Sequence, residues 1–166
     1  MLLDGFGFLE VIILEVKEMC LEWLRSRICE GYISPPNYLE DIGSSEVIGI
    51  INAEFIDGIK LVSDRDFKTT TKEELMRFLK EDITDKFGYI NEYYDCDDFA
   101  FHLMGQISNQ SWGCLPFGIL YIKKSNGSLH ALNCFIDKDR ELWIIEPQND
   151  SIYVRPKSWQ CVMLLM

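Results

Sequence analysis

Four strand-like runs follow one another in the second half of the sequence and constrain its fold more than any other feature. Rich in apolar, β-branched and aromatic residues, the runs cover residues 118–123, 129–136, 141–146 and 151–154. Turn-forming stretches separate them: Ser125-Asn126-Gly127, Asp137-Lys138-Asp139 and Gln148-Asn149-Asp150. Since short turns join neighbouring antiparallel strands, the pattern predicts an antiparallel β-meander.

Two helices are predicted ahead of this meander. From Cys96 onward, apolar side chains recur at helical spacing over residues 95–107, as expected for a helix with one buried face. A second helix begins with a capping sequence at 71–74, has Leu75, Phe78, Leu79 and Ile83 as its apolar side, and is closed by Gly88. Short broken apolar runs between 46 and 63 predict small strands. The expected fold class is α+β, with helices packed on the meander.

The N-terminal part of the chain predicts a further helix over residues 8–30, ended by Gly31. Its apolar positions cover more than a narrow stripe, which indicates burial on two sides. A core helix explains this pattern, and so does a self-association surface, which would make a homodimer through this helix. The chain shows no internal repeat and no linker. We expect one domain over 1–166, with an N-terminal helical extension (1–40) and a core (60–155).

The net charge of −11, from 27 acidic and 16 basic residues, argues against two classes of partner. An acidic surface repels nucleic acid and anionic membranes, whereas it attracts divalent cations. The sequence also lacks an uncharged run of the ~20 residues needed to span a bilayer. Six cysteines without CxxC spacing predict free thiols and a reducing, cytoplasmic location, with a disulfide-linked extracellular protein as the alternative.

Cys96 stands at the start of its predicted helix. The free N–H groups and partial positive charge at a helix N-terminus favour a thiolate and can hold an oxyanion. A buried structural cysteine explains the same position. Of the two histidines, His102 lies about 240° around the helix from Cys96 and faces elsewhere. His130, at the start of a strand, is the remaining candidate for a base.

Glu146 is the candidate for a third member of this group. With a turn centred near Lys138, His130 and Glu146 face each other across the hairpin and point to the same side. A carboxylate in this position orients the imidazole ring. An ordinary polar pair between strands has the same spacing.

Three aspartates crowd the candidate nucleophile: Asp95, Asp97 and Asp98. Their charge disfavours a thiolate. They can cap the helix, or they can bind a calcium ion that neutralises them, because carboxylate and amide oxygens are natural calcium ligands. Gln148 and Asn149 supply amides that could approach the helix start.

Three segments together resemble a known family: Asp95-Cys96-Asp97-Asp98-Phe99-Ala100, His130-Ala131-Leu132-Asn133 and Glu146-Pro147-Gln148. They are similar to motifs of the papain-like C-terminal domain of fungal agglutinins of the Marasmius type. The resemblance covers roughly residues 60–155 and implies a papain-like fold, with Cys96 as nucleophile, His130 as general base and Glu146 as orienting residue. It also implies calcium dependence, with Asp97, Asp98 and Gln148 as metal ligands. The sugar-binding β-trefoil of the agglutinins has no counterpart here, so lectin activity is not implied.

The expected function is therefore a cysteine peptidase, with possible calcium dependence, that cleaves protein or peptide substrates through Cys96, His130 and Glu146. In this interpretation residues 60–155 are the catalytic core. One alternative keeps the same three residues for an amidase or a transglutaminase-like acyl transfer. The other is a non-catalytic, calcium-responsive binding or dimerisation module.

Overall fold

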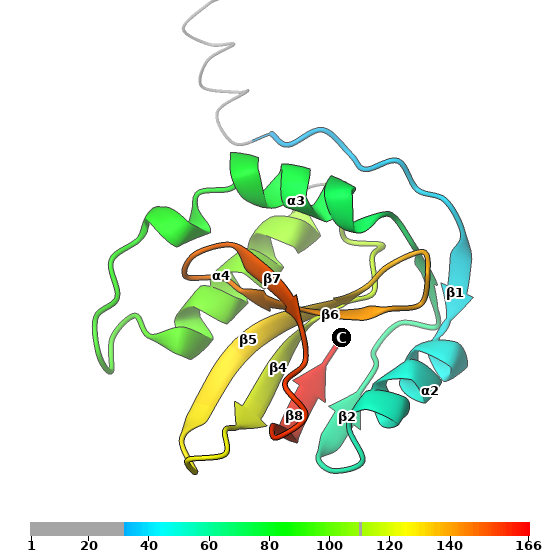
Figure 1. Ribbon diagram of the computed structural model, residues 1–166. Helices are drawn as coiled ribbons and strands as arrows, with labels where there is room; N and C mark the ends of the chain where they lie inside the picture. Colours follow the sequence, from blue (N-terminus) through cyan, green and yellow to red (C-terminus); the bar gives the residue numbers. More distant parts are fainter. Residues whose placement is uncertain (1–31, 110) are drawn as a thin grey trace, which may run out of the picture. The chain divides into compact units, whose positions relative to one another are not determined.

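Within residues 32–109 and 111–166, which the computed structural model describes, a six-stranded sheet lies at the centre (Figure 1). Its strand order is β2-β8-β4-β5-β6-β7. The strands are β2 (Ile59–Leu61), β4 (Phe117–Lys123), β5 (Leu129–Ile136), β6 (Leu142–Glu146), β7 (Ser151–Val154) and β8 (Gln160–Leu165). The helix predicted for 8–30, and the homodimer through it, lie outside the described residues.

The predicted meander is confirmed. Strands β4, β5, β6 and β7 pair in sequence order, each antiparallel to the next. Positive φ angles at Gly127 (87°) and Asp150 (57°) agree with the turn chemistry read from the sequence. Short apolar runs and the turn residues between them were therefore sufficient to place these four strands.

The sheet continues beyond the meander through β8, which the sequence pattern did not reveal. β8 lies between β4, to which it is antiparallel, and β2, to which it is parallel. The sheet is therefore mixed, not wholly antiparallel. Gly118 permits the close approach of β4 and β8, because a Cβ at this position would lie 2.4 Å from the backbone oxygen of Leu165. The pairing of β2 with β8 joins segments far apart in the sequence and so leaves no local signature.

The prediction of small strands between 46 and 63 is wrong for its first half. Residues Ser44–Glu54 form helix α2, and the strand is limited to Ile59–Leu61. Val47 and Ile51, about one helical turn apart, are fully buried in the core. Their β-branched side chains favour strands locally, but burial of this helical face overrides that preference.

Helix α3 (Lys72–Glu81) begins as predicted, since the hydroxyl of Thr71 accepts a hydrogen bond from the backbone N–H of Glu74 at 3.2 Å. The helix ends at Glu81, earlier than Gly88, and is followed by the 3-10 helix η1 (Thr84–Lys86). Ile83 therefore lies outside the helix and is exposed.

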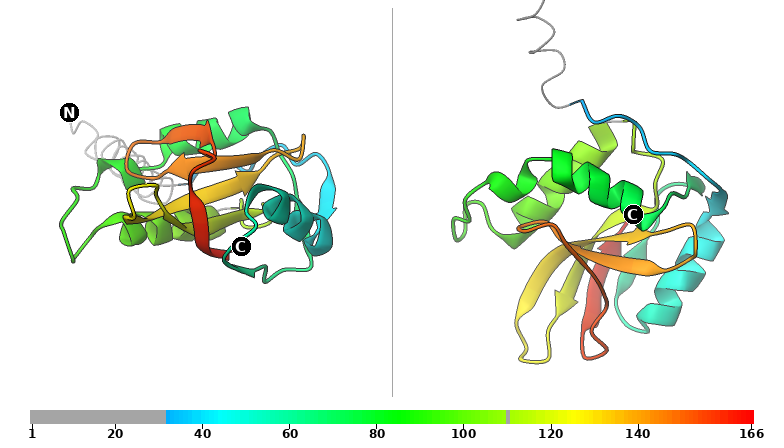
Figure 2. Two further views of the ribbon diagram at one scale, coloured as in Figure 1. Left: turned by 60° about the horizontal axis from the view of Figure 1, so that its bottom comes forward. Right: turned by 45° about the horizontal axis from the view of Figure 1, so that its top comes forward.

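The remaining elements complete two layers around the sheet (Figures 1 and 2). Helix α4 (Cys96–Asn109) and α3 pack in one apolar cluster with Phe117, Phe135 and Ile145 of the sheet. Helix α2 packs in another cluster with Leu132 and Ile144, whose side chains point to the opposite face. A separate pair of short strands is formed by β1 (Asp41–Gly43) and β3 (Asp66–Lys68). The mixed α/β architecture is consistent with the predicted α+β class. Among the described helices, none combines the length and hydropathy needed to cross a membrane.

Candidate functional site

The N-terminal end of α4 brings the candidate residues to one end of the sheet. Asp95 precedes the helix, and its backbone N–H donates a hydrogen bond to Oδ2 of Asp98 at 3.0 Å. Asp98 thus reaches back from the third helical position, as in a capping box. This hydrogen bond between neighbouring residues explains why the helix begins at Cys96. It also fixes the backbone around the Cys96 side chain.

Cys96 occupies the helix start predicted for it and packs, half-buried, with Ala100, Ile119 and Ala131. Burial raises the pKa of its thiol, the carboxylates of Asp95 and Asp97 raise it further, and the backbone N–H of Ala131 opposes them. Ala131 is the neighbour of His130 on β5. No hydrogen bond joins Cys96 to His130 within the described residues. Cys96 therefore packs beside the residue that follows His130, and the roles predicted for these two side chains stay predictions.

His130 and Glu146 are in direct contact. Nε2 of His130 lies 2.7 Å from Oε2 of Glu146, and the side chains are 14% and 16% exposed. The second carboxylate oxygen, Oε1, is buried and has no hydrogen bond within the described residues. The glutamate therefore holds one ring nitrogen of the histidine and leaves Nδ1 as the nitrogen available to another group.

The register that creates this contact differs from the predicted one. Asn133 pairs with Ile145 and Ile136 with Leu142, so the hairpin is centred on Asp139 and not near Lys138. His130 and Glu146 are consequently diagonal neighbours. A register difference of two residues keeps both side chains on the same face, which is why the contact survives.

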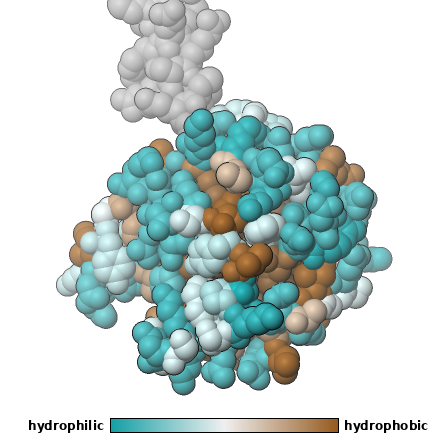
Figure 3. Space-filling model, viewed as in Figure 1, coloured by the Kyte–Doolittle hydropathy of each residue, from teal (hydrophilic) through white to brown (hydrophobic). Residues whose placement is uncertain are grey.

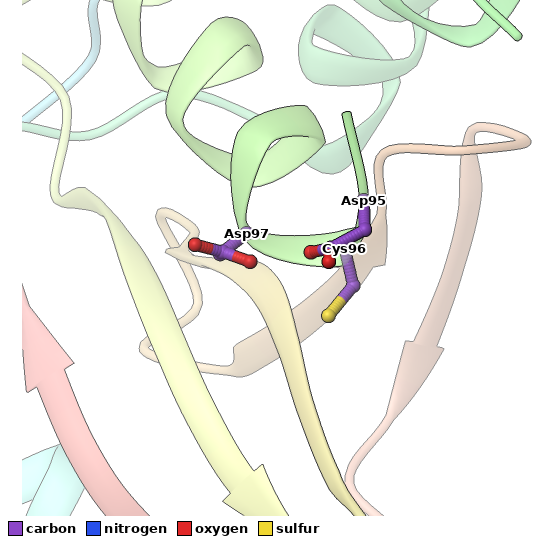
Figure 4. A group of neighbouring side chains, drawn as sticks. All are labelled: Asp95, Cys96 and Asp97. Atoms are coloured by element: carbon purple, nitrogen blue, oxygen red, sulfur yellow. The ribbon is translucent and has the colours of Figure 1, made fainter. Parts of the chain in front are cut away.

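Two carboxylates meet beside the thiol at the start of α4 (Figure 4). The metal-ligating atoms of Asp95, Cys96 and Asp97 lie within 4.8 Å of one another. Contact with Asp95, followed by burial, raises the pKa of Asp97, while the same contact lowers the pKa of Asp95. Two like charges this close need a shared proton or a cation. This pair fits a divalent cation such as calcium, which prefers carboxylate oxygen.

The predicted ligands Asp97, Asp98 and Gln148 occupy three different settings. Asp97 faces Asp95, whereas Asp98 uses one oxygen to cap α4. Gln148 lies two residues after Glu146, half-buried in the turn that leads to β7, and its side chain makes no hydrogen bond within the described residues. The structure therefore groups Asp97 with Asp95, which the sequence analysis counted among the three crowding aspartates but did not name among the individual metal ligands.

Two further residues complete the surroundings. Tyr121 of β4 packs on the Cys96 cluster, and burial raises the pKa of its hydroxyl, with Asp97 adding to the effect. Its position on the same face of β4 as Ile119 could have indicated this. His102 faces away from the site, as predicted, and its Nδ1 lies 2.5 Å from the hydroxyl of Tyr94.

The fold matches solved structures, while no protein-family model and no curated protein matches the sequence. One similar structure is titled as a complex of PSL1a with E-64; it has a TM-score of 0.68 and 21% identity, over 76% of this chain and 51% of that chain. Another is the Polyporus squamosus lectin bound to the epitope Neu5Acα2-6Galβ1-4GlcNAc, with a TM-score of 0.66 and 21% identity, over 76% of this chain and 49% of that chain. This chain thus spans about half the length of the fungal lectin whose fold it shares.

These neighbours correct the expected function. The prediction of an enzyme, a cysteine peptidase with a catalytic triad, is contradicted: one structure that shares the fold is titled as a lectin bound to a glycan epitope. The similarity to fungal agglutinins holds at the level of the fold, whereas the papain-like assignment is not supported by the neighbours. The observed positions of Cys96, His130 and Glu146 do not depend on that assignment.

Proposed function

We propose that this chain is a ligand-binding domain whose site is the N-terminal end of α4 together with His130 and Glu146. The observation that carries this proposal is the contact between the Asp95 and Asp97 carboxylates beside the Cys96 thiol. On an ordinary acidic surface, carboxylates are kept apart by solvent. Two carboxylates held against each other cost free energy that a bound cation would recover.

Calcium is the cation proposed for this position. Asp95 and Asp97 would supply the first oxygen ligands, and the resemblance to the agglutinins adds Asp98 and Gln148 to the set. Asp98 retains a carboxylate oxygen that is not used by the helix cap. Bound calcium would supply a positive charge that neutralises the acidic helix start and accepts further oxygen atoms from a ligand.

His130 and Cys96 are the proposed polar contacts of the ligand. The imidazole is oriented by Glu146 through Nε2, which leaves Nδ1 for a hydrogen bond to the ligand. The thiol is half-buried beside the backbone of Ala131 and contributes a soft, weakly polar surface. A site of this kind combines a small number of placed polar groups with an apolar floor.

Calorimetric titration of calcium into chelator-treated protein tests the cation site. We expect a dissociation constant of about 10⁻⁵ to 10⁻³ M, weakened at least tenfold in Asp97→Asn. Asp64→Asn is the matched control, since Asp64 is an exposed acid outside the site. Equal calcium binding by wild type and Asp97→Asn, or none by wild type, would reject the site.

The ligand is sought by probing glycan and peptide arrays with the intact chain, with calcium and with a chelator. Glycans come first because a structural neighbour is a lectin bound to a glycan epitope. We expect at least one glycan or peptide whose retention depends on calcium and is lost in His130→Ala. If no retained ligand responds to either change, the proposed ligand site at α4 is rejected.

A further inference from the structure

A groove separate from the α4 site runs between the C-terminal end of α2 and the segment that links β7 to β8. Two adjoining hollows form it, of about 290 Å³ and about 540 Å³, and they share Glu54, Arg155 and Lys157 as lining residues. We name it the α2–β8 groove. Figure 1 shows the two elements that border it, α2 and the segment from β7 to β8, and Figure 3, viewed from the same side, shows hydrophobic residues exposed among hydrophilic ones. Its combined size suits a ligand of one or two sugar rings.

Arg155 fixes the walls of the groove. Its Nε donates to Glu54 at 3.2 Å, and NH1 lies 3.3 Å from the carbonyl oxygens of Lys157 and Trp159. The guanidinium also stacks over the ring of Phe55, 4.9 Å from its centroid. One largely buried side chain thus ties the end of α2 to the β7–β8 segment. The groove is therefore preformed, which lowers the entropic cost of binding.

The charges that line the groove balance. Three acids (Glu54, Asp57 and Glu141) face three bases (Arg140, Arg155 and Lys157). The chain as a whole carries a net charge of −11, so this neutral region differs from its surroundings. Neither a cationic nor an anionic ligand gains from a local excess of charge here. A neutral ligand with many hydrogen-bonding groups meets donors and acceptors of both kinds.

Trp159 provides an aromatic surface with a spare donor. The other two tryptophans in the described part of the chain use their indole N–H in hydrogen bonds, Trp112 to Ser34 and Trp143 to Asp137. Trp159, half-buried in the lining, makes no such bond there. Its ring lies at 83° to that of Tyr153, with centroids 6.1 Å apart, and Nζ of Lys124 lies over it at 5.8 Å from the centroid. The part of this ring that lines the groove, together with its indole N–H, suits a ligand with both an apolar face and hydroxyl groups.

We infer that the α2–β8 groove binds a neutral saccharide. The apolar face of a sugar ring would pack on Trp159, while its hydroxyl groups would bond to the indole N–H, Lys157, Ser158 and Gln160 of the lining. Ile56 at the rim is 92% exposed, and a bound ligand would cover part of this apolar side chain and shield it from water. The inference does not depend on the α4 site, so either proposal can fail alone.

Retention of the intact chain on an array of neutral and sialylated oligosaccharides tests this inference, followed by titration with the retained glycan. We expect neutral glycans to be retained and Trp159→Ala to weaken binding at least tenfold, with Ser158→Ala weakening it less. Trp159→Phe keeps a ring in place but removes the indole N–H, so it should weaken binding less than Trp159→Ala, which separates lost contacts from lost folding. Chelator and Asp97→Asn, which act on α4, should leave this binding unchanged.

Three outcomes would overturn the inference. The first is retention of no neutral glycan. The second is binding that survives Trp159→Ala but is lost with chelator or in Asp97→Asn, since the ligand would then occupy the α4 site. The third is retention of sialylated glycans alone, which would contradict the neutral class of ligand.

Discussion

His130 and Glu146 form a hydrogen-bonded pair across the β5–β6 hairpin, 2.7 Å from Nε2 to Oε2, with both side chains more than four-fifths buried. They are diagonal and not directly opposed in the register of the two strands. The pair joins the beginning of one strand to the end of the next. Its contribution to stability can be measured separately from any role in binding.

Removing either partner should destabilise the protein, and removing both should cost less than the sum. We expect the free energy of unfolding to fall by about 1–3 kcal/mol in His130→Ala and in Glu146→Ala, because each leaves a largely buried polar group unpaired. Urea unfolding of both single variants and the double variant gives the coupling, expected at about 1 kcal/mol. Additive losses would mean that the contact contributes nothing.

Two neighbouring aspartates of α4 should behave differently in chelator-treated protein. Asp98→Ala removes the acceptor for the backbone N–H of Asp95 and should lower the free energy of unfolding by about 0.5–2 kcal/mol. Asp97→Ala removes a carboxylate that is opposed by Asp95, so we expect a smaller loss or none. Thermal unfolding distinguishes the two variants. Equal losses would contradict the separate roles of cap and cation ligand.

Asp150 should make stability fall as pH rises. Burial raises the pKa of its carboxyl to about 6, with Asp85 and Asp82 adding to the effect. The folded state keeps this proton between about pH 4 and 6, where the unfolded state has released it. The free energy of unfolding therefore decreases through that window and this contribution is level above it.

The variant Asp150→Asn isolates this effect, and asparagine suits the positive φ of 57° at this position. Relative to wild type, its stability in chelator should rise between pH 4 and 7 by about 1–2 kcal/mol, after allowance for solvent screening. Chemical unfolding at a series of pH values measures the difference. A difference that stays constant with pH would refute the assignment.

Gly118 should not tolerate a side chain, because a Cβ there would lie 2.4 Å from the backbone oxygen of Leu165 in β8. Gly118→Ala is expected to destabilise the protein by about 1–3 kcal/mol. Gly49→Ala is the matched control: a Cβ there meets nothing within 4 Å, and alanine in the helix α2 should stabilise by about 0.5–1 kcal/mol. Similar effects of the two changes would indicate that β4 and β8 can separate without cost.

The four strands of the meander and helix α4 were predictable because their signals are local. Short apolar runs, turn stretches and helical spacing each act within about ten residues, which is the scale on which sequence patterns work. The same signals put Cys96 at a helix N-terminus and His130 and Glu146 on one face of a hairpin. They could not specify the class of function, because identical placements serve catalysis, binding or plain packing.

Tertiary contacts decided the rest. α2 is helical because Val47 and Ile51 find a buried face against the sheet, despite their preference for strands. β8 takes its place because β2, from the first half of the chain, offers it a parallel edge. The backbone at the start of α4 turns Asp98 to the helix cap and Asp97 to Asp95. Local sequence thus determined which elements form in the second half of the chain. Only the packed structure determined which edges pair, which register holds and which carboxylates meet, because these depend on segments far apart in the chain.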